Sequence, residues 1–171
     1  EGKVFVTSND GYLHAMDTVT GKVLWEVGPI LYGDLKEPAS ASLGYSGPLY
    51  HEGRIYNASL TGRGYVFCFD AATGKKLWEH GYAAPYQMNS AAYSHGKGPK
   101  ATPVFGSGKV CTVGITGTVT CLDSATGKVA WSHPNLGDAL YGTASSPAID
   151  GGLQITQTGK QDSGSISAYS L

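Results

Sequence analysis

The sequence predicts an all-β protein made of antiparallel hairpins. Three observations lead to this class: one nine-residue segment occurs three times, turn-forming and β-branched residues are abundant, and no apolar stretch follows the helical period. Successive copies of the segment start 53 residues apart, and they read DTVTGKVLW (17–25), DAATGKKLW (70–78) and DSATGKVAW (123–131). A fixed period of this size indicates a repeat architecture.

Each repeat begins with a predicted β-hairpin, whose strands are joined by turns that carry Gly, Asn, Asp or Thr. The first strand is expected at GKVFVTS (2–8), GRIYNAS (53–59), GKVCTVG (108–114) and GGLQITQ (151–157). The second strand is expected at GYLHAMD (11–17), GYVFCFD (64–70), GTVTCLD (117–123) and GSISAYS (164–170). The fourth copy loses the final Asp of the pattern.

A tight turn of the form D-x-x-T-G leads from each of the first three hairpins into a third strand. Its Asp can accept hydrogen bonds from turn amides, its Thr can add a hydroxyl contact, and its Gly supplies a positive φ. The later hairpins are preceded by short segments that each carry a proline, at 46–50, 101–105 and 145–149. Because proline is best tolerated on a sheet edge, we expect these segments to form innermost edge strands.

Counting strands in this way gives three, four, four and three per repeat. The first repeat lacks the proline strand, and the fourth stops at Leu171 before a third strand. Sheets with apolar residues on both faces need covering on both faces, which a radial stack of sheets provides. The prediction is one partial β-propeller over residues 1–171, with full blades at 46–80 and 101–133 and partial blades at 1–27 and 145–171.

The pattern A/C-x-D-x-x-T-G-K-x-x-W resembles the tryptophan-docking motif of the pyrroloquinoline-quinone-type (PQQ-like) β-propeller repeat. The resemblance implies that the motif residues dock adjacent blades, with each indole N–H bonded to a neighbouring repeat: Asp17, Gly21, Trp25, Asp70, Gly74, Trp78, Asp123, Gly127 and Trp131. It also places the small residues Ala15, Cys68, Cys121 and Ala168 where blades approach closely. Complete members of the family usually have seven or eight blades, so this chain would supply about half a ring.

An open half-ring would expose an apolar blade face at each end, more than a soluble monomer usually leaves bare. We expect either a fragment of a longer polypeptide or two copies that close an eight-bladed ring about a twofold axis.

Long connections that enter the innermost strands are the predicted ligand or partner face. They span 28–45, 80–100 and 134–144, and their candidate residues are Tyr32, Tyr45, Tyr86, Asn89, Tyr93, His95 and Tyr141. The alternative is that these tyrosines plug the channel and pack the loops onto the blades.

In the dehydrogenases that share this repeat, a calcium or lanthanide ion held by Glu, Asn and Asp activates the quinone PQQ, and adjacent cysteines form a disulfide over it. This sequence has no adjacent cysteines, and Asp34, Glu37, Asn89 and Asp138 form no recognisable motif for a cation. We therefore predict no metal site, assign no catalytic or cofactor-binding residue, and keep PQQ with calcium or a lanthanide as the alternative.

Cys111 and Cys121 lie on the two arms of one predicted hairpin with a three-residue loop at 115–117, so they should face each other. A disulfide and a pair of buried thiols both fit this placement. Cys68 shares the repeat position of Cys121, which favours a packing role. His80 and His133 also occupy equivalent positions, two residues after a Trp, which favours a structural role.

Composition excludes some partners. The 12 basic and 13 acidic residues give a net charge of −1, so no basic field would attract nucleic acid. No apolar run reaches the ~18 residues of a membrane span.

Three functions fit this reading: a noncatalytic scaffold or binding module, part of a periplasmic PQQ-dependent alcohol or sugar dehydrogenase, and a structural assembly through the open blade faces. The resemblance implies an extracytoplasmic location, a protein partner or self-association, and membrane contact only through a parent protein or lipid anchor outside this chain.

Overall fold

The computed structural model describes residues 2–8, 11–28, 46–59, 64–83, 90, 100–134, 142–160 and 162–171. Within these ranges the chain forms β-strands and turns, with no α-helix. The all-β prediction is confirmed.

The strands form four antiparallel sheets, which we call blades 1 to 4 in chain order. Blade 1 contains β1 (Lys3–Thr7), β2 (Leu13–Asp17) and β3 (Val23–Val27). Blade 2 contains β4 (Leu49–His51), β5 (Arg54–Ser59), β6 (Gly64–Asp70) and β7 (Lys76–Tyr82). Blade 3 contains β8 (Val104–Gly106), β9 (Lys109–Val113), β10 (Val119–Asp123) and β11 (Val129–His133). Blade 4 contains β12 (Ala148–Asp150), β13 (Leu153–Lys160) and β14 (Ser163–Ser170).

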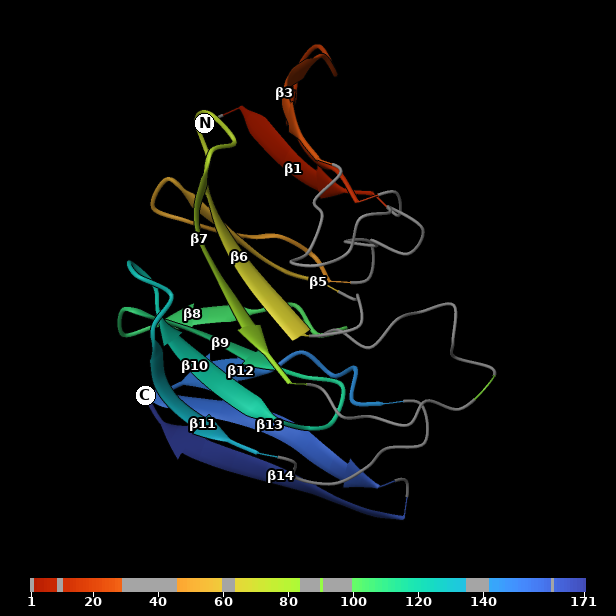
Figure 1. Cartoon of the computed structure of the whole chain (residues 1–171), viewed down its shortest axis with the longest axis vertical. Helices are drawn as coiled ribbons and strands as arrows, with labels where there is room; N and C mark the ends of the chain where they lie inside the picture. Colours follow the sequence, from red (N-terminus) through yellow and green to blue (C-terminus); the bar gives the residue numbers. More distant parts are fainter. Residues whose placement is uncertain are drawn as a thin grey trace.

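The blades follow one another in space in their chain order, from the red blade 1 to the blue blade 4 (Figure 1). Their strand counts of three, four, four and three are those that the sequence predicts. Since every blade pairs its strands in chain order, all the connections within a blade are hairpins. The chain is therefore a partial β-propeller with two full and two partial blades.

The short strands β4, β8 and β12 each lie at an edge of their sheet. β8 contacts both β4 and β12, so the three strands lie beside one another across blades. The prolines do not fall inside these strands: Pro48, Pro103 and Pro147 each come one residue before the strand begins. This placement keeps the missing N–H of proline out of the hydrogen-bond ladder.

In the fourth repeat, the pairing of β13 with β14 is shifted by one residue relative to the sequence alignment. The amide after the second strand donates to Gly2 in blade 1, to Gly53 in blade 2 and to Gly108 in blade 3, but to Gly152 rather than Gly151 in blade 4. Strand pairing decides this register, because Leu153 faces Ser170 as Lys109 faces Asp123. Gln154 is therefore the structural equivalent of Val110, and Leu153 is not.

The hydrophobic core lies between the blades. Leu13 of blade 1 is buried against Ile55, Phe67 and Phe69 of blade 2. Val110 of blade 3 packs with Tyr56 and Cys68 of blade 2, and Tyr169 of blade 4 packs against Val113 and Val119 of blade 3. Each blade thus buries the face of its neighbour, which is why the strands carry apolar residues on both faces.

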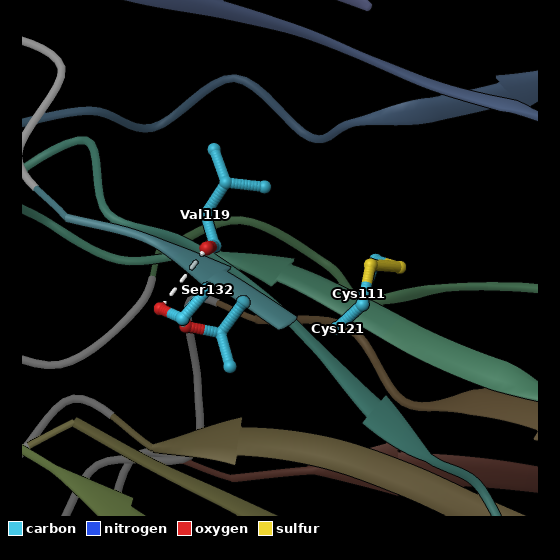
Figure 2. Close-up of a disulfide and its surroundings, with 5 residues drawn as sticks. Cys111, Val119, Cys121 and Ser132 are labelled. Atoms are coloured by element: carbon cyan, nitrogen blue, oxygen red, sulfur yellow. Dashed lines mark hydrogen bonds between the residues drawn. A yellow bond between two sulfur atoms is a disulfide. The ribbon is translucent and has the colours of Figure 1, made fainter. Parts of the chain in front are cut away.

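A disulfide joins Cys111 and Cys121, which are register partners on β9 and β10 (Figure 2). Of the two states that the sequence leaves open, the structure has the disulfide. The hairpin turn also has the expected length, since Gly114 N–H donates to the Thr118 carbonyl across residues 115–117. Cys68 is a free, buried thiol, and burial raises its pKa to about 11, so it stays protonated near neutral pH.

Candidate functional site

The repeated D-x-x-T-G segments form three equivalent turns at one end of the blades, which we call the turn end. Asp17 Oδ1 accepts hydrogen bonds from the Val19 amide (3.1 Å), the Thr20 amide (2.7 Å) and the Thr20 hydroxyl (2.8 Å). Asp70 receives the same set from Ala72 and Thr73, and Asp123 accepts from the amide and hydroxyl of Thr126. Because these bonds favour the ionised form, they hold the pKa of each of the three carboxyls below its usual value.

The glycine of each later turn lies against the tryptophan of the preceding blade. A Cβ added to Gly74 would come within 2.8 Å of Trp25 Cε3, and one added to Gly127 within 2.6 Å of Trp78 Cε3. Both glycines also have a positive φ. Two constraints, backbone conformation and close approach, therefore require glycine at these positions.

Two of the three indoles donate a hydrogen bond to the turn of the next blade. Trp25 Nε1 donates to the Ala71 carbonyl (3.2 Å), and Trp78 Nε1 donates to the Ser124 carbonyl (3.0 Å). Trp131 Nε1 is buried and has no hydrogen-bond partner among the described residues. Its ring packs instead against Tyr169 of blade 4, with ring centroids 5.7 Å apart.

Each tryptophan pairs across the ladder with a small residue. Ala15 faces Trp25, Cys68 faces Trp78 and Cys121 faces Trp131, and in each case the register shifts immediately after the small residue. The small side chain leaves room for the indole, and the bulge increases the local twist of the outer strands.

The outward faces of blades 1 and 4 expose apolar side chains to solvent, whereas a neighbouring blade buries the equivalent side chains of the other blades. Val4 of blade 1 is 43% exposed, whereas its equivalents Ile55, Val110 and Gln154 are fully buried. Ile166 of blade 4 is 79% exposed, whereas its equivalents are fully buried, namely Leu13, Val66 and Val119. The repeat therefore places apolar side chains for a neighbouring blade at both ends of the chain.

The connections between blades emerge at the end of the sheets opposite the turn end, which we call the loop end. They leave β3, β7 and β11 after Val27, Tyr82 and His133, beside the hairpin turn at 114–118. All the predicted ligand or partner residues of these connections lie outside the described residues: Tyr32, Tyr45, Tyr86, Asn89, Tyr93, His95 and Tyr141. The same holds for Asp34, Glu37 and Asp138.

The two repeat-equivalent histidines have different surroundings. His133 stacks on Tyr169 of blade 4, with ring centroids 4.5 Å apart, so it contributes to packing between blades 3 and 4. His80 lines a cleft between blades 2 and 3, where burial lowers its pKa. Sequence reasoning did not find this cleft, although the aligned second strands contain a signal for it: Thr118 and Thr120 stand where blade 2 has Tyr65 and Phe67.

A quinone and its cation would need a cage of carboxylate and amide oxygens. Within the described ranges no group of three His, Cys, Asp or Glu side chains could hold a metal ion. The carboxylates of Asp17, Asp70 and Asp123 are engaged in turns. The part of the chain that the structure describes therefore does not fit a quinone site. The same part has no helix with the length and apolar character to cross a membrane.

Comparison with known proteins gives one family for the whole chain. A family model described as outer membrane protein assembly factor BamB matches residues 1–91 and 62–171. Among curated relatives, the dehydrogenase subunit of the quinone alcohol dehydrogenase of Komagataeibacter europaeus is 29% identical over 136 residues. That match covers 77% of this chain and 18% of the enzyme, so the chain spans less than a fifth of this relative's length.

Two solved structures show the same fold over the whole chain. BamB from Moraxella catarrhalis aligns with a TM-score of 0.68 and 17% identity, over 99% of this chain and 46% of that one. The computationally designed Ika4 protein aligns with a TM-score of 0.63 and 14% identity, over 100% of this chain and 86% of that one.

Proposed function

The chain belongs to the PQQ-like β-propeller repeat family, and on that premise we propose that it is a noncatalytic sector of a closed propeller ring. In this role its end blades dock further blades, and its loop end binds a ligand or a protein partner. The observation that carries the proposal is the exposure of Val4 and Ile166 at positions that every inner blade buries. The other blades cover these positions with a neighbouring blade, so the two open end faces are suited to bind a further blade in the same way.

We assign blade docking to the tryptophan motif. The indoles of Trp25 and Trp78 reach the turn of the following blade by hydrogen bonds, and the glycines of those turns lie against the same rings. A large apolar ring with one donor is suited to a contact that is apolar on one side and polar at its edge. Trp131 contacts Tyr169 of blade 4 through its ring, without a described hydrogen bond from Nε1.

Two arrangements would close the ring. Further blades could come from a longer polypeptide, as supported by the alignment of this chain with 46% of the BamB structure. They could also come from a second copy, which would make the protein a self-assembling structural unit. The designed Ika4 chain, 86% of which aligns with this one, has the same fold in a chain of comparable size.

A sector of a PQQ-dependent alcohol dehydrogenase is the second candidate function. It is supported by the curated relatives, which are alcohol dehydrogenases that include quinone-dependent enzymes. In such an enzyme the described residues would supply blades, because they do not fit the quinone site. The Cys111–Cys121 disulfide supports an extracytoplasmic location for either function, since disulfides persist in oxidising compartments.

A native mass spectrum of the purified protein, recorded with and without added calcium and PQQ, distinguishes these functions. The scaffold predicts a mass made of protein chains only, unchanged by the additions. A complex that becomes heavier by one quinone and one metal ion would overturn the noncatalytic proposal and favour the dehydrogenase. The number of chains in the same spectrum distinguishes a ring of two copies from a sector of a longer chain.

A further inference from the structure

A cleft of about 490 Å³ opens between blades 2 and 3 at the loop end. One wall comes from the end of β7 in blade 2, and the other comes from β10, β11 and the 114–118 turn in blade 3. Its polar lining residues are His80, Tyr82, Thr116, Thr118, Thr120 and Ser132. We call this space the hydroxyl cleft.

The cleft exists because blade 3 carries small residues where blade 2 carries aromatic ones. Aligning GYVFCFD with GTVTCLD places Tyr65 and Phe67 at the positions of Thr118 and Thr120. Phe67 belongs to the buried cluster that contains Leu13 of blade 1, and Tyr65 packs on the same cluster, so these two rings fill space between blades 1 and 2. The smaller threonines leave the equivalent space between blades 2 and 3 open. Replacing two packing residues by hydroxyls at one interface forgoes burial energy, and such local departures are typical of functional sites.

The hydroxyls on the blade 3 wall are arranged in pairs. Thr120 Oγ1 lies 3.0 Å from Ser132 Oγ, and Thr116 Oγ1 lies 2.8 Å from Thr118 Oγ1. Ser132 Oγ also donates to the Val119 carbonyl at 3.3 Å, a bond drawn in Figure 2 on the sheet face opposite the disulfide. When the Ser132 proton points to that carbonyl, Thr120 must donate to Ser132. Thr120 then keeps its lone pairs as acceptors for a donor in the cleft.

The blade 2 wall supplies complementary groups. Burial lowers the pKa of His80, so at neutral pH its imidazole is uncharged and offers one donor and one acceptor. Burial also raises the pKa of Tyr82, whose hydroxyl is therefore protonated, and this hydroxyl has no hydrogen-bond partner among the described residues. The Tyr82 ring lies over Gly64 and its hydroxyl lies near Gly114, so Tyr82 shapes the floor of the cleft, and His80 supplies the exchangeable donor and acceptor of this wall.

The lining contains no Asp, Glu, Lys or Arg among the described residues. An ionic ligand would lose its hydration without gaining an opposite charge, which disfavours it. An uncharged ligand with several hydroxyls could both donate to and accept from the two walls. The volume lies within the range of small-molecule sites, roughly 300 to 1,000 Å³.

We propose that the hydroxyl cleft binds a small uncharged molecule with several hydroxyl groups, of about the size of a monosaccharide. The site lies between the two inner blades, away from the open end faces. It includes residues 80–83 and Pro134 of the connections, so it deepens the loop-end ligand site of the proposed function. If the cleft bound no ligand, the end blades could still dock further blades. If the ring did not close, the cleft between blades 2 and 3 would still be present.

The test titrates the isotope-labelled 171-residue chain with D-glucose and follows backbone amide shifts by NMR. We expect saturable shifts confined to residues 80–83 and 116–120. The Thr118→Tyr/Thr120→Phe double variant places the blade 2 side chains in the cleft and should reduce affinity at least tenfold. Thr120→Val keeps the volume but removes one hydroxyl, and losing one hydrogen bond should weaken binding about fivefold.

Thr156→Val is the matched control, because Thr156 is a buried threonine of β13 in blade 4, outside the cleft lining. This variant should bind D-glucose like the unmodified chain. Thermal unfolding of each variant confirms that it is folded before binding is compared. The absence of saturable shifts in the unmodified chain, or equal binding by the folded double variant, would overturn the proposal.

Discussion

Replacing Trp78 with Phe tests the contact between blades 2 and 3, and replacing Trp131 with Phe provides a matched control from the same chain. The change at Trp78 removes the 3.0 Å hydrogen bond from Nε1 to the Ser124 carbonyl. That carbonyl still accepts from Arg54 Nη1 at 3.0 Å and from the Tyr56 hydroxyl at 3.4 Å, so it is not left unpaired. The cost is therefore the net value of one hydrogen bond, about 1 kcal/mol, plus a packing loss of roughly 1 to 2 kcal/mol.

The same change at Trp131 removes similar packing but no described hydrogen bond. It also removes a buried donor without a partner, which returns about 1 kcal/mol. We expect the free energy of unfolding to fall by about 2 to 3 kcal/mol for Trp78→Phe and by about 0 to 1 kcal/mol for Trp131→Phe.

Urea unfolding of the purified chain, followed by circular dichroism, measures both values. Equal losses for the two variants would refute the reasoning, because they would show that the indole hydrogen bond contributes nothing to the blade contact. A neutral Trp78→Phe variant would refute it as well.

Three further outcomes are expected. In urea unfolding, Gly127→Ala should lower the free energy of unfolding by roughly 2 kcal/mol more than Gly21→Ala. Both glycines have a positive φ, but only Gly127 lies against a tryptophan ring, whereas Gly21 is surrounded by open space. Equal losses would argue against a close blade contact. The free energy of unfolding should fall as the pH drops below about 3.8, the unfolded-state pKa of Asp17, Asp70 and Asp123, because carboxylates with a lowered folded-state pKa stabilise the protein only while ionised. Replacing all three with Asn should flatten this part of the pH profile. An unchanged profile would count against the turn hydrogen bonds. Thiol titration of the denatured, unreduced chain should find one thiol, Cys68, and three after reduction, whereas three before reduction would exclude the Cys111–Cys121 disulfide.

The fold could be predicted from the sequence because its signals are local and repeated. The spacing of Asp, Gly and Trp sets the turn and the strand after it, and the strand counts follow from where the pattern is incomplete. The register of the fourth repeat was less predictable. Two glycines, Gly151 and Gly152, offer two alignments, and only the pairing of Leu153 with Ser170 selects one of them.

The candidate site was less predictable, because it depends on which faces meet in space. The alignment shows that blade 3 has Thr118 and Thr120 where blade 2 has Tyr65 and Phe67. That this difference leaves a cleft is clear only from the structure, in which Tyr65 and Phe67 fill the equivalent space one blade earlier. The long connections carry no repeat and no strand pattern, so sequence reasoning could name their tyrosines but could not place them. Register predicted that Cys111 and Cys121 face each other, but pairing alone does not decide between thiols and a disulfide.

The central claim is that further blades cover both ends of this chain, and thiol labelling of the native assembly tests it most directly. Cysteines introduced at Val4 and Ile166 report on the two end faces, and Val19→Cys is the control, because Val19 is 89% exposed in a turn. Background labelling is low, since Cys68 is buried and the other cysteines are paired. We expect both end-face thiols to react far more slowly than the thiol at position 19 in the native assembly, and to reach its rate after unfolding. Labelling of both faces at the rate of the control in the folded protein would contradict the claim.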